Sequence, residues 1–152
     1  MIKLDRTLTY RLHLLHKLTD AGSQRAYVAG AGLSMSDGRC LTAVGTFAPL
    51  SVNDLAKKAN LNKGQASRAA QSLVDQGLVL KAASPTDGRG VVLSLTANGQ
   101  TAWMLAMNVV KQRNQDIFGV LGADEQAQLS SFFDRLIDGA QAGGEVLENT
   151  ED

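Results

Sequence analysis

The sequence predicts a mainly α-helical fold with one small β-hairpin. Most segments are rich in Ala and Leu and repeat apolar residues every three or four positions, as amphipathic helices do. Residues 78–95 instead have two strand-like runs separated by a cluster of turn residues. At 152 residues, of which 44% are hydrophobic and 20% charged, the chain fits one domain with an appended interface.

Two helices are expected before Pro49. The first should cover residues 4–27 and end at the small-residue break 29–33. The second should follow Ser36 and end near Phe47, because proline blocks its continuation. The first helix carries an apolar stripe made of Leu4, Leu8, Leu12, Leu15, Leu18 and Tyr27.

A pair of short helices is expected over residues 51–77. Ser51 is a good N-cap for the first, and Asn62 for the second, with Gln65 in the reciprocal capping-box position. Gly77 should end the second helix as a left-handed residue. The expected buried face of that helix is Ala66, Ala69, Ala70, Leu73 and Val74.

A hairpin and two more helices should complete the chain. The strands are expected at 78–83 and 91–95, followed by a long helix from Thr96 to about Gly119. A last helix should start near Gly122, and residues 139–152 have the composition of a frayed acidic end. The apolar face of the last helix is Leu129, Phe132, Phe133, Leu136 and Ile137.

The outward face of the second short helix favours contact with DNA. It has no acid before Asp75, and Arg and Gln side chains read guanine and adenine edges in the major groove. At the hairpin tip, Arg89 lies between glycines and suits a narrow minor groove, while Asp87 would hold a basic side chain in place. The residues predicted to form the DNA interface are Ser51, Asn62, Lys63, Gln65, Ser67, Arg68, Gln71, Thr86, Asp87 and Arg89.

The charge distribution agrees with this interpretation although the net charge is zero. Residues 1–95 carry 12 Lys and Arg against 6 acids, whereas residues 96–152 carry 3 against 9. Such asymmetry favours a polyanion-facing part and a separate acidic part. The alternatives are an acidic end that only improves solubility, and a helical hairpin on a ribbon whose charges are merely solvated.

The motifs resemble the MarR family of winged-helix transcriptional regulators. The resemblance covers roughly residues 4–140 and is most specific in the Asp-x-Arg wing, 87–89, followed by Leu-Thr-x-x-Gly at 95–99. It implies a homodimeric repressor that reads a near-palindromic operator in double-stranded DNA. The expected division is a dimerisation helix at 1–30, a winged helix-turn-helix domain at 34–95, dimerisation helices at 96–140 and a flexible acidic tail at 141–152. The wing has fewer basic residues than is usual in the family.

Two kinds of signal remain open. The resemblance implies release from DNA by a small aromatic or phenolic carboxylate, and the candidate ligand residues are Arg11, His13, His16 and Tyr27. These residues do not share one helix face, so ordinary surface or interface roles are the alternative. The single cysteine, Cys40, lies beside Arg39 and would allow redox sensing if it were exposed, although a buried cysteine is the commoner case.

Other classes of function lack their motifs. The sequence has no catalytic spacing of known type, no P-loop and no dinucleotide fingerprint, so neither an enzyme nor a cofactor is expected. One cysteine and two histidines do not suggest a metal site, and neither a signal peptide nor a membrane span is apparent. The expected location is the cytoplasm. A helical protein-interaction adaptor without DNA binding is the alternative from another class.

Overall fold

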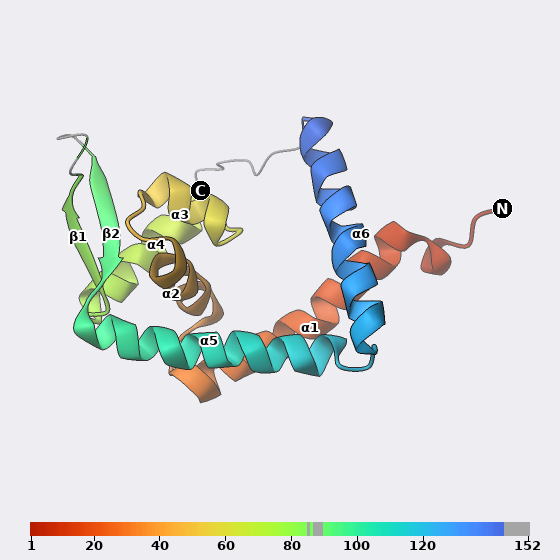
Figure 1. The fold of residues 1–152 in the computed structure, drawn as a ribbon, viewed down its shortest axis with the longest axis horizontal. Coiled ribbons are helices and arrows are strands. Elements are labelled where there is room, and N and C mark those ends of the chain that lie inside the picture. The colour runs from red at the N-terminus through yellow and green to blue at the C-terminus, as the bar shows by residue number, and fades with distance from the viewer. Residues whose placement is uncertain (85, 87–89, 145–152) are drawn as a thin grey trace.

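A computed structural model describes residues 1–84, 86 and 90–144 and confirms a mainly helical fold with one β-hairpin (Figure 1). A lobe formed by α2, α3, α4 and the hairpin lies at one end of the long helix α5, and α6 rises from the other end. The elements are η1 Leu4–Arg6, α1 Leu8–Ala31, α2 Met35–Phe47, α3 Val52–Lys58, α4 Lys63–Asp75, β1 Val79–Ala83, β2 Val91–Leu95, α5 Ala97–Phe118 and α6 Ala123–Ala142.

The ends of the first two helices differ from the prediction. A 3-10 turn comes first, and α1 then runs to Ala31, so the expected break at residues 29–33 is wrong at its start. The helix ends only at Gly32, which has a φ of 66° and is the residue that can turn the chain there. The cap of α2 is Ser34 rather than Ser36, because the Ser34 Oγ accepts the Asp37 amide at 3.1 Å.

The lobe has a closed apolar core. Ser51 caps α3, and Asn62 and Gln65 form the predicted capping box of α4. The alanine face of α4 packs inward as predicted, with Ala66 and Leu73 fully buried and Val74 partly so. The largest fully buried side chains of the chain all belong to this lobe: Leu41, Leu55, Leu73, Leu93, Val44 and Cys40.

The hairpin is antiparallel, with Val79 opposite Leu95 and Ala83 opposite Val91. Gly77, with a φ of 74°, follows α4 in the left-handed conformation predicted for it. Leu93 also exchanges backbone hydrogen bonds with Leu50, at 2.8 and 3.4 Å, which ties the hairpin to the entry of α3. Leu50 is an isolated bridge residue outside the two strands, so the sequence gives no strand-like pattern that would indicate its contact with Leu93.

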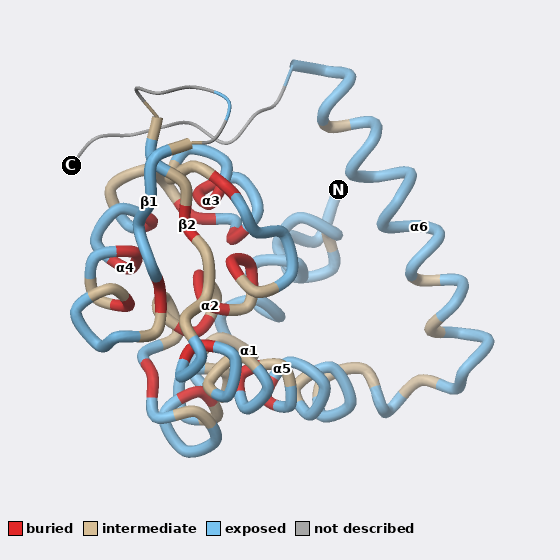
Figure 2. Tube along the Cα trace, turned by 60° about the vertical axis from the view of Figure 1, so that its left-hand side comes forward, coloured by how far each residue is buried: buried red, intermediate tan, exposed pale blue. Residues whose placement is uncertain are grey.

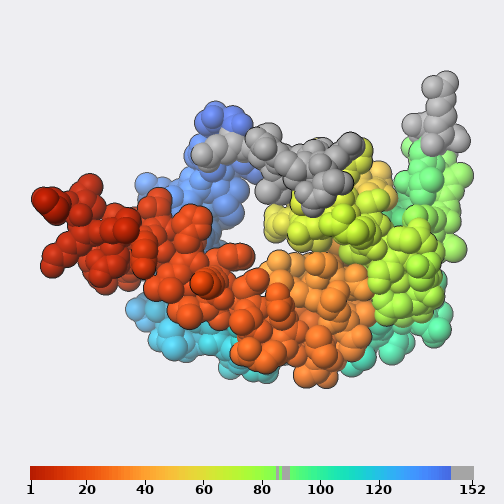
Figure 3. Space-filling view, turned by 180° about the vertical axis from the view of Figure 1, so that it is seen from behind, coloured from red at the N-terminus to blue at the C-terminus, as the bar shows by residue number. Residues whose placement is uncertain are grey.

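The terminal helices are much less covered than the lobe. α5 crosses α1 near Tyr27, Ala106 and Val109, which are buried. α6 has no buried residue, as Figure 2 shows by colour. The first half of α1 projects beyond the rest of the molecule in Figure 3. Residues 139–142 are helical, so the frayed end predicted from residue 139 begins too early; residues 145–152 lie outside the described part of the chain.

Candidate DNA interface and polar pocket

The outer face of α4 is set by its capping box and its alanines. Because α4 buries three alanines and one leucine, Leu73, it packs closely on the lobe and leaves the opposite face outside. Gln65, Ser67, Arg68 and Gln71 are exposed there, and Lys63 is half-buried at the first helical position. The predicted residues of this helix therefore do lie on one accessible surface.

Arg68 is the most prominent cation of this face. Its guanidinium lies alongside Gly64, where Nη1 would stand 3.3 Å from an added Cβ. Arg68 and Gln65 also line a polar hollow of about 410 Å³, together with Ser34 and Asp37 at the start of α2. The guanidinium thus extends along the helix towards its N-terminus, where positive charge and backbone N–H groups attract phosphate.

Several predicted DNA-contact residues have structural tasks in addition. The Asn62 amide donates to Gln65 Oε1 at 3.2 Å, and the Gln65 amide donates to Asn62 Oδ1 at 2.7 Å. The capping bond fixes the Gln65 side chain against the start of α4, so paired recognition of adenine would require it to turn away from its cap. The Ser51 hydroxyl likewise accepts the Asp54 amide at 3.1 Å.

Gln71 connects the helix to the hairpin. Its Oε1 accepts from Lys81 Nζ at 2.8 Å, and its Nε2 donates to Asp75 Oδ1 at 2.8 Å. The side chain therefore has both of its polar atoms occupied within the lobe. Lys81, on β1, brings a further cation next to the exposed face of α4.

At the hairpin tip only Thr86 of the predicted wing residues is described. It is exposed, and its amide donates to the Ser84 Oγ at 3.4 Å. Asp87 and Arg89 lie outside the described residues, so their predicted minor-groove role stays a prediction.

The four residues predicted to hold a ligand are not brought together. Arg11, His13 and His16 are exposed on the projecting half of α1, whereas Tyr27 is buried. Eleven residues of helix separate His16 from Tyr27, which is about 16 Å at 1.5 Å per residue. Arg11 instead lines an apolar groove between α1 and α6.

Tyr27 borders a different pocket, formed where α1, α2 and α5 meet. This pocket, of about 210 Å³, contains two arginines, Arg39 of α2 and Arg113 of α5. Burial raises the pKa of the Tyr27 hydroxyl, while the positive charge of Arg39 partly opposes that shift. The remaining lining residues are Ser23, Val110, Asn114, Ile117 and Phe118.

The two arginines are held differently. Arg113 Nε donates to the Ser23 Oγ at 3.2 Å, and Arg113 Nη2 donates to the Thr19 carbonyl at 3.1 Å, which fixes its guanidinium against α1. Each arginine also meets an acid: Arg39 Nη2 lies 3.4 Å from Asp20 Oδ1, and Arg113 Nη1 lies 3.3 Å from Asp116 Oδ2. Sequence reasoning missed both arginines, because 74 positions separate them and neither belongs to a local motif.

Cys40 lies in the lobe core and not on a reactive surface. Its side chain is fully buried, and burial, with a smaller contribution from the Asp37 carboxylate, raises the pKa of the thiol to about 12. A thiol with so little thiolate character is a poor redox sensor. The burial removes the exposure that the redox alternative required of Cys40.

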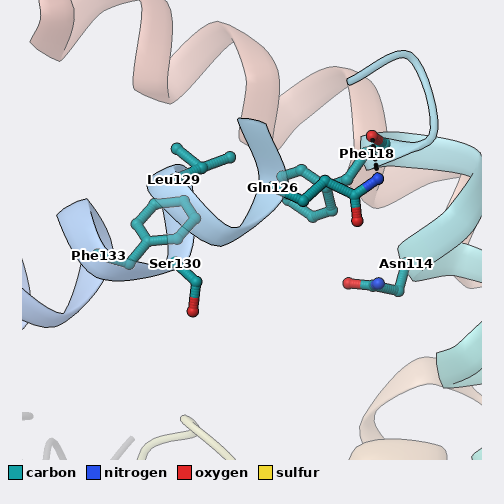
Figure 4. Close-up of a pocket in the computed structure, with 6 residues that line it drawn as sticks. All are labelled: Asn114, Phe118, Gln126, Leu129, Ser130 and Phe133. Atoms are coloured by element: carbon teal, nitrogen blue, oxygen red, sulfur yellow. Dashed lines mark hydrogen bonds between the residues drawn. The ribbon is translucent and has the colours of Figure 1, made fainter. Parts of the chain in front are cut away.

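A further pocket lies between the end of α5 and α6 (Figure 4). Phe118, Leu129 and Phe133 line it beside Gln126, whose Nε2 donates to the Phe118 carbonyl at 3.1 Å. It shares Asn114 and Phe118 with the arginine pocket, and it shares Leu129 and Phe133 with the apolar groove. The three hollows thus follow one another from α2 to the projecting part of α1.

Among the described residues, no helix is long and apolar enough to cross a membrane. Within the same part of the chain, no group of three or more His, Cys, Asp or Glu side chains is arranged to hold a metal ion.

A capped helix pair, an antiparallel hairpin and an exposed polar helix face define a winged-helix fold, in which DNA-binding members place the second helix of the pair in the major groove. Residues 31–90 match the family model described as "MarR family". The chain is 26% identical over 111 residues to the HTH-type transcriptional repressor Rv2887 of Mycobacterium tuberculosis, covering 73% of this chain and 80% of the relative. Residues 31–90 thus match the MarR family model, and over most of its length the chain is similar to MarR-family winged-helix regulators.

Two solved structures show how far the similarity extends. The structure of Bordetella bronchiseptica BpsR, from work on regulation of its DNA binding by 6-hydroxynicotinic acid, has a TM-score of 0.80 at 18% identity and covers 91% of this chain and 98% of that one. Rv2887 in complex with salicylic acid has a TM-score of 0.69 at 25% identity and covers 87% and 97%. The predicted mainly α-helical winged-helix fold with a small β-wing is confirmed.

Proposed function

We propose that the chain is a homodimeric repressor that binds a near-palindromic operator through α4 and the hairpin and is released by a small aromatic carboxylate. The observation that carries the DNA-binding part is the outer face of α4. Gln65, Ser67 and Arg68 are exposed there, and no acid precedes Asp75. The relative Rv2887, named as a transcriptional repressor, supports the direction of regulation.

The exposed apolar faces of the terminal helices support a second copy of this chain as their partner. Leu8 is 80% exposed, Leu136 is 67% exposed and Phe133 is 38% exposed. Between α1 and α6 runs a groove of about 520 Å³, lined by Leu8, Leu12, Leu14, Leu15, Leu18, Leu129, Phe133 and Arg11. Apolar surface of this kind marks an interaction site rather than a solvated surface.

The charges of the two faces are complementary. Residues 1–18 carry four Lys and Arg and one acid, while residues 123–142 carry four acids and one Arg. In a two-fold dimer, a contact between α1 of one copy and α6 of the other occurs twice. The complementary charges therefore favour pairing of α1 from one copy with α6 from the other. A two-fold protein in turn suits half-sites about one DNA turn, ~34 Å, apart.

The arginine pocket supports the carboxylate effector. A carboxylate prefers the paired donors of a guanidinium, and Arg39 and Arg113 place two guanidinium groups beside the apolar surfaces of Val110, Ile117 and Phe118. A bound carboxylate would compete there with Asp20 and Asp116. Its volume of about 210 Å³ suits a single ring better than a drug-sized molecule, whose pockets measure roughly 300–1,000 Å³. The salicylic acid bound to Rv2887 has this chemistry. The proposed effector site therefore consists of Tyr27, Arg39 and Arg113. Arg11, His13 and His16 belong instead to the part of α1 that we assign to the dimer interface.

The deciding experiment is selection of bound sequences from random double-stranded DNA by the full chain, with and without salicylate. A recovered near-palindrome whose binding weakens with salicylate supports the proposal. Binding should also fall steeply with salt, by a slope of about 0.9 in log affinity per phosphate contacted. If no sequence is enriched and the chain instead binds a protein partner with an affinity that does not depend on salt, the chain is a protein-interaction adaptor.

A further inference from the structure

Three consecutive residues in the first turns of α2 contact three different parts of the molecule. Asp37 bonds to the recognition helix α4, Gly38 packs against Tyr27 of α1, and Arg39 lines the effector pocket. The described structure thus connects the pocket and the DNA-reading helix through one short piece of backbone.

On the DNA-reading side, Asp37 holds α4 through two side chains. Its Oδ2 accepts from the Ser72 Oγ at 2.6 Å and from Gln76 Nε2 at 3.2 Å, and Gln76 Nε2 also donates to the Ser72 Oγ at 3.1 Å. Hydrogen bonds to a carboxylate are shorter and stronger than neutral ones. Since the Asp37 amide is itself held by the Ser34 Oγ at 3.1 Å, the carboxylate is fixed relative to the start of α2.

On the pocket side, the backbone of α2 has little space to move independently. Gly38 is buried, and a Cβ added there would lie 2.6 Å from Cε1 of the Tyr27 ring, so ring and backbone are in direct contact. Arg39 meets Asp20 at 3.4 Å, a long contact for an ion pair. A carboxylate in the pocket would compete with Asp20 for this guanidinium and would act on Tyr27 and Arg39 together.

We infer that Asp37 is a positioning residue that couples the pocket to DNA recognition. A change at Arg39 or Tyr27 shifts the helical turn at residues 37–39, and the Asp37 carboxylate passes that shift to Ser72 of α4 and to Gln76, the residue that follows the helix. The regulatory part of this inference rests on the proposed effector function. The mechanical link between Arg39 and α4 does not, and it is testable without DNA or effector.

The first test is a double-mutant cycle read by hydrogen exchange of the α4 amides, residues 63–75, in the full-length protein. Arg39→Ala should change their protection, and the same change made in an Asp37→Ala background should have little further effect. Directly coupled pairs depart from additivity by roughly 2- to 100-fold. Additive effects of Arg39→Ala and Asp37→Ala would overturn the link.

Asp75→Ala is the matched control, because Asp75 also accepts from an α4 side chain, Gln71, at 2.8 Å. Asp75→Ala removes the same charge, but none of the hydrogen bonds described for Asp75 reaches α2. Its effect should therefore add to that of Arg39→Ala. If Asp37→Ala fails to fold, Asp37→Asn and Ser72→Ala replace it. Asn keeps an acceptor for Ser72 and should retain part of the coupling, whereas Ser72→Ala should lose most of it.

The second test measures operator affinity with and without salicylate. A coupling of about 5- to 150-fold is typical of allosteric proteins. In Asp37→Ala that ratio should fall towards 1, while salicylate still binds the free protein, as calorimetry would record. An unchanged ratio in this variant contradicts the inference. If wild type ignores salicylate but the hydrogen-exchange cycle is non-additive, the effector class proposed above is wrong and the link stands.

Discussion

The winged lobe buries its large apolar side chains within one chain, whereas the terminal helices leave theirs exposed. In the lobe, Leu41, Leu55, Leu73 and Leu93 have no exposed surface, and the polar groups face outward. In the projecting half of α1 and in α6, leucines and phenylalanines at helical spacing stay open. The lobe is therefore closed within one chain, whereas the terminal helices leave apolar faces open, and the proposed dimer would cover them. The comparison predicts that mutations in the two regions will fail in different ways.

The largest effect is expected from a charge in the terminal face. Phe133→Asp should convert the dimer to monomers, since a carboxylate in an apolar interface loses its hydration. Operator affinity should then fall by roughly 10²- to 10⁴-fold, because two linked lobes bind far more tightly than one. Sedimentation analysis and operator titration measure both changes.

The control for this variant is Ser131→Asp, which adds the same charge to an exposed position about 160° around α6 from Phe133, on the opposite side of the helix. It should remain a dimer. If Phe133→Asp also stays dimeric and binds operator normally, the terminal faces are not the dimer interface.

A matched pair of leucine truncations sharpens the comparison. Leu73→Ala removes a side chain with no exposed surface and should cost about 2–5 kcal/mol of unfolding free energy at any protein concentration. Leu136→Ala removes one that is 67% exposed in a single chain, so its cost should come from the dimer and depend on concentration. Denaturant titrations at several concentrations separate the two, and equal, concentration-independent losses would show that Leu136 is buried within its own chain.

Much of this contrast could be predicted from the sequence. The caps Ser51 and Asn62, the left-handed Gly77 and the alanine face of α4 follow from local rules, because each depends on neighbours within four residues. The apolar stripes of the terminal helices were also visible, but periodicity does not tell an intrachain core from an interface. Their exposure in the single chain supports the proposed interface.

The polar pocket could not be predicted in the same way. Arg39 and Arg113 come from helices that meet only in the fold, and the spacing within α1 relates Tyr27 only to residues of its own helix. Local spacing places side chains on one helix but carries no information about which distant helix crosses it. The hydrogen bonds of Gln71 with Lys81 and Asp75 could not be predicted for the same reason. The outward position of Gln71 alone suggests that it reads a base.

A smaller effect, confined to the lobe, is expected from its exposed arginine. Arg68→Ala should weaken operator binding by about 1–3 kcal/mol and relax the preference at one base position, if Arg68 reads a base edge. Lys63→Ala should instead weaken all sequences about equally, as loss of a phosphate contact does. Both variants should stay dimeric, in contrast to Phe133→Asp. Competition binding with operators altered at single positions measures the difference, and unchanged preference in Arg68→Ala would remove its role in recognition.

The smallest effect tests how completely the lobe is closed. Because burial raises the pKa of the Cys40 thiol from 9.0 to about 12, the folded chain binds this proton more tightly than the unfolded chain does. The resulting stability is fully present below pH 9 and declines as the pH rises towards 12, since the unfolded state ionises first. Near pH 7, native protein should therefore react with iodoacetamide far more slowly than unfolded protein, and peroxide should leave operator binding unchanged. In Cys40→Ala, the part of the alkaline loss of stability that comes from the thiol should disappear. The part that comes from Tyr27, whose pKa is also raised, should remain. Rapid alkylation of native Cys40, or release from DNA by peroxide that Cys40→Ser abolishes, would show that the lobe opens and that the redox alternative is correct.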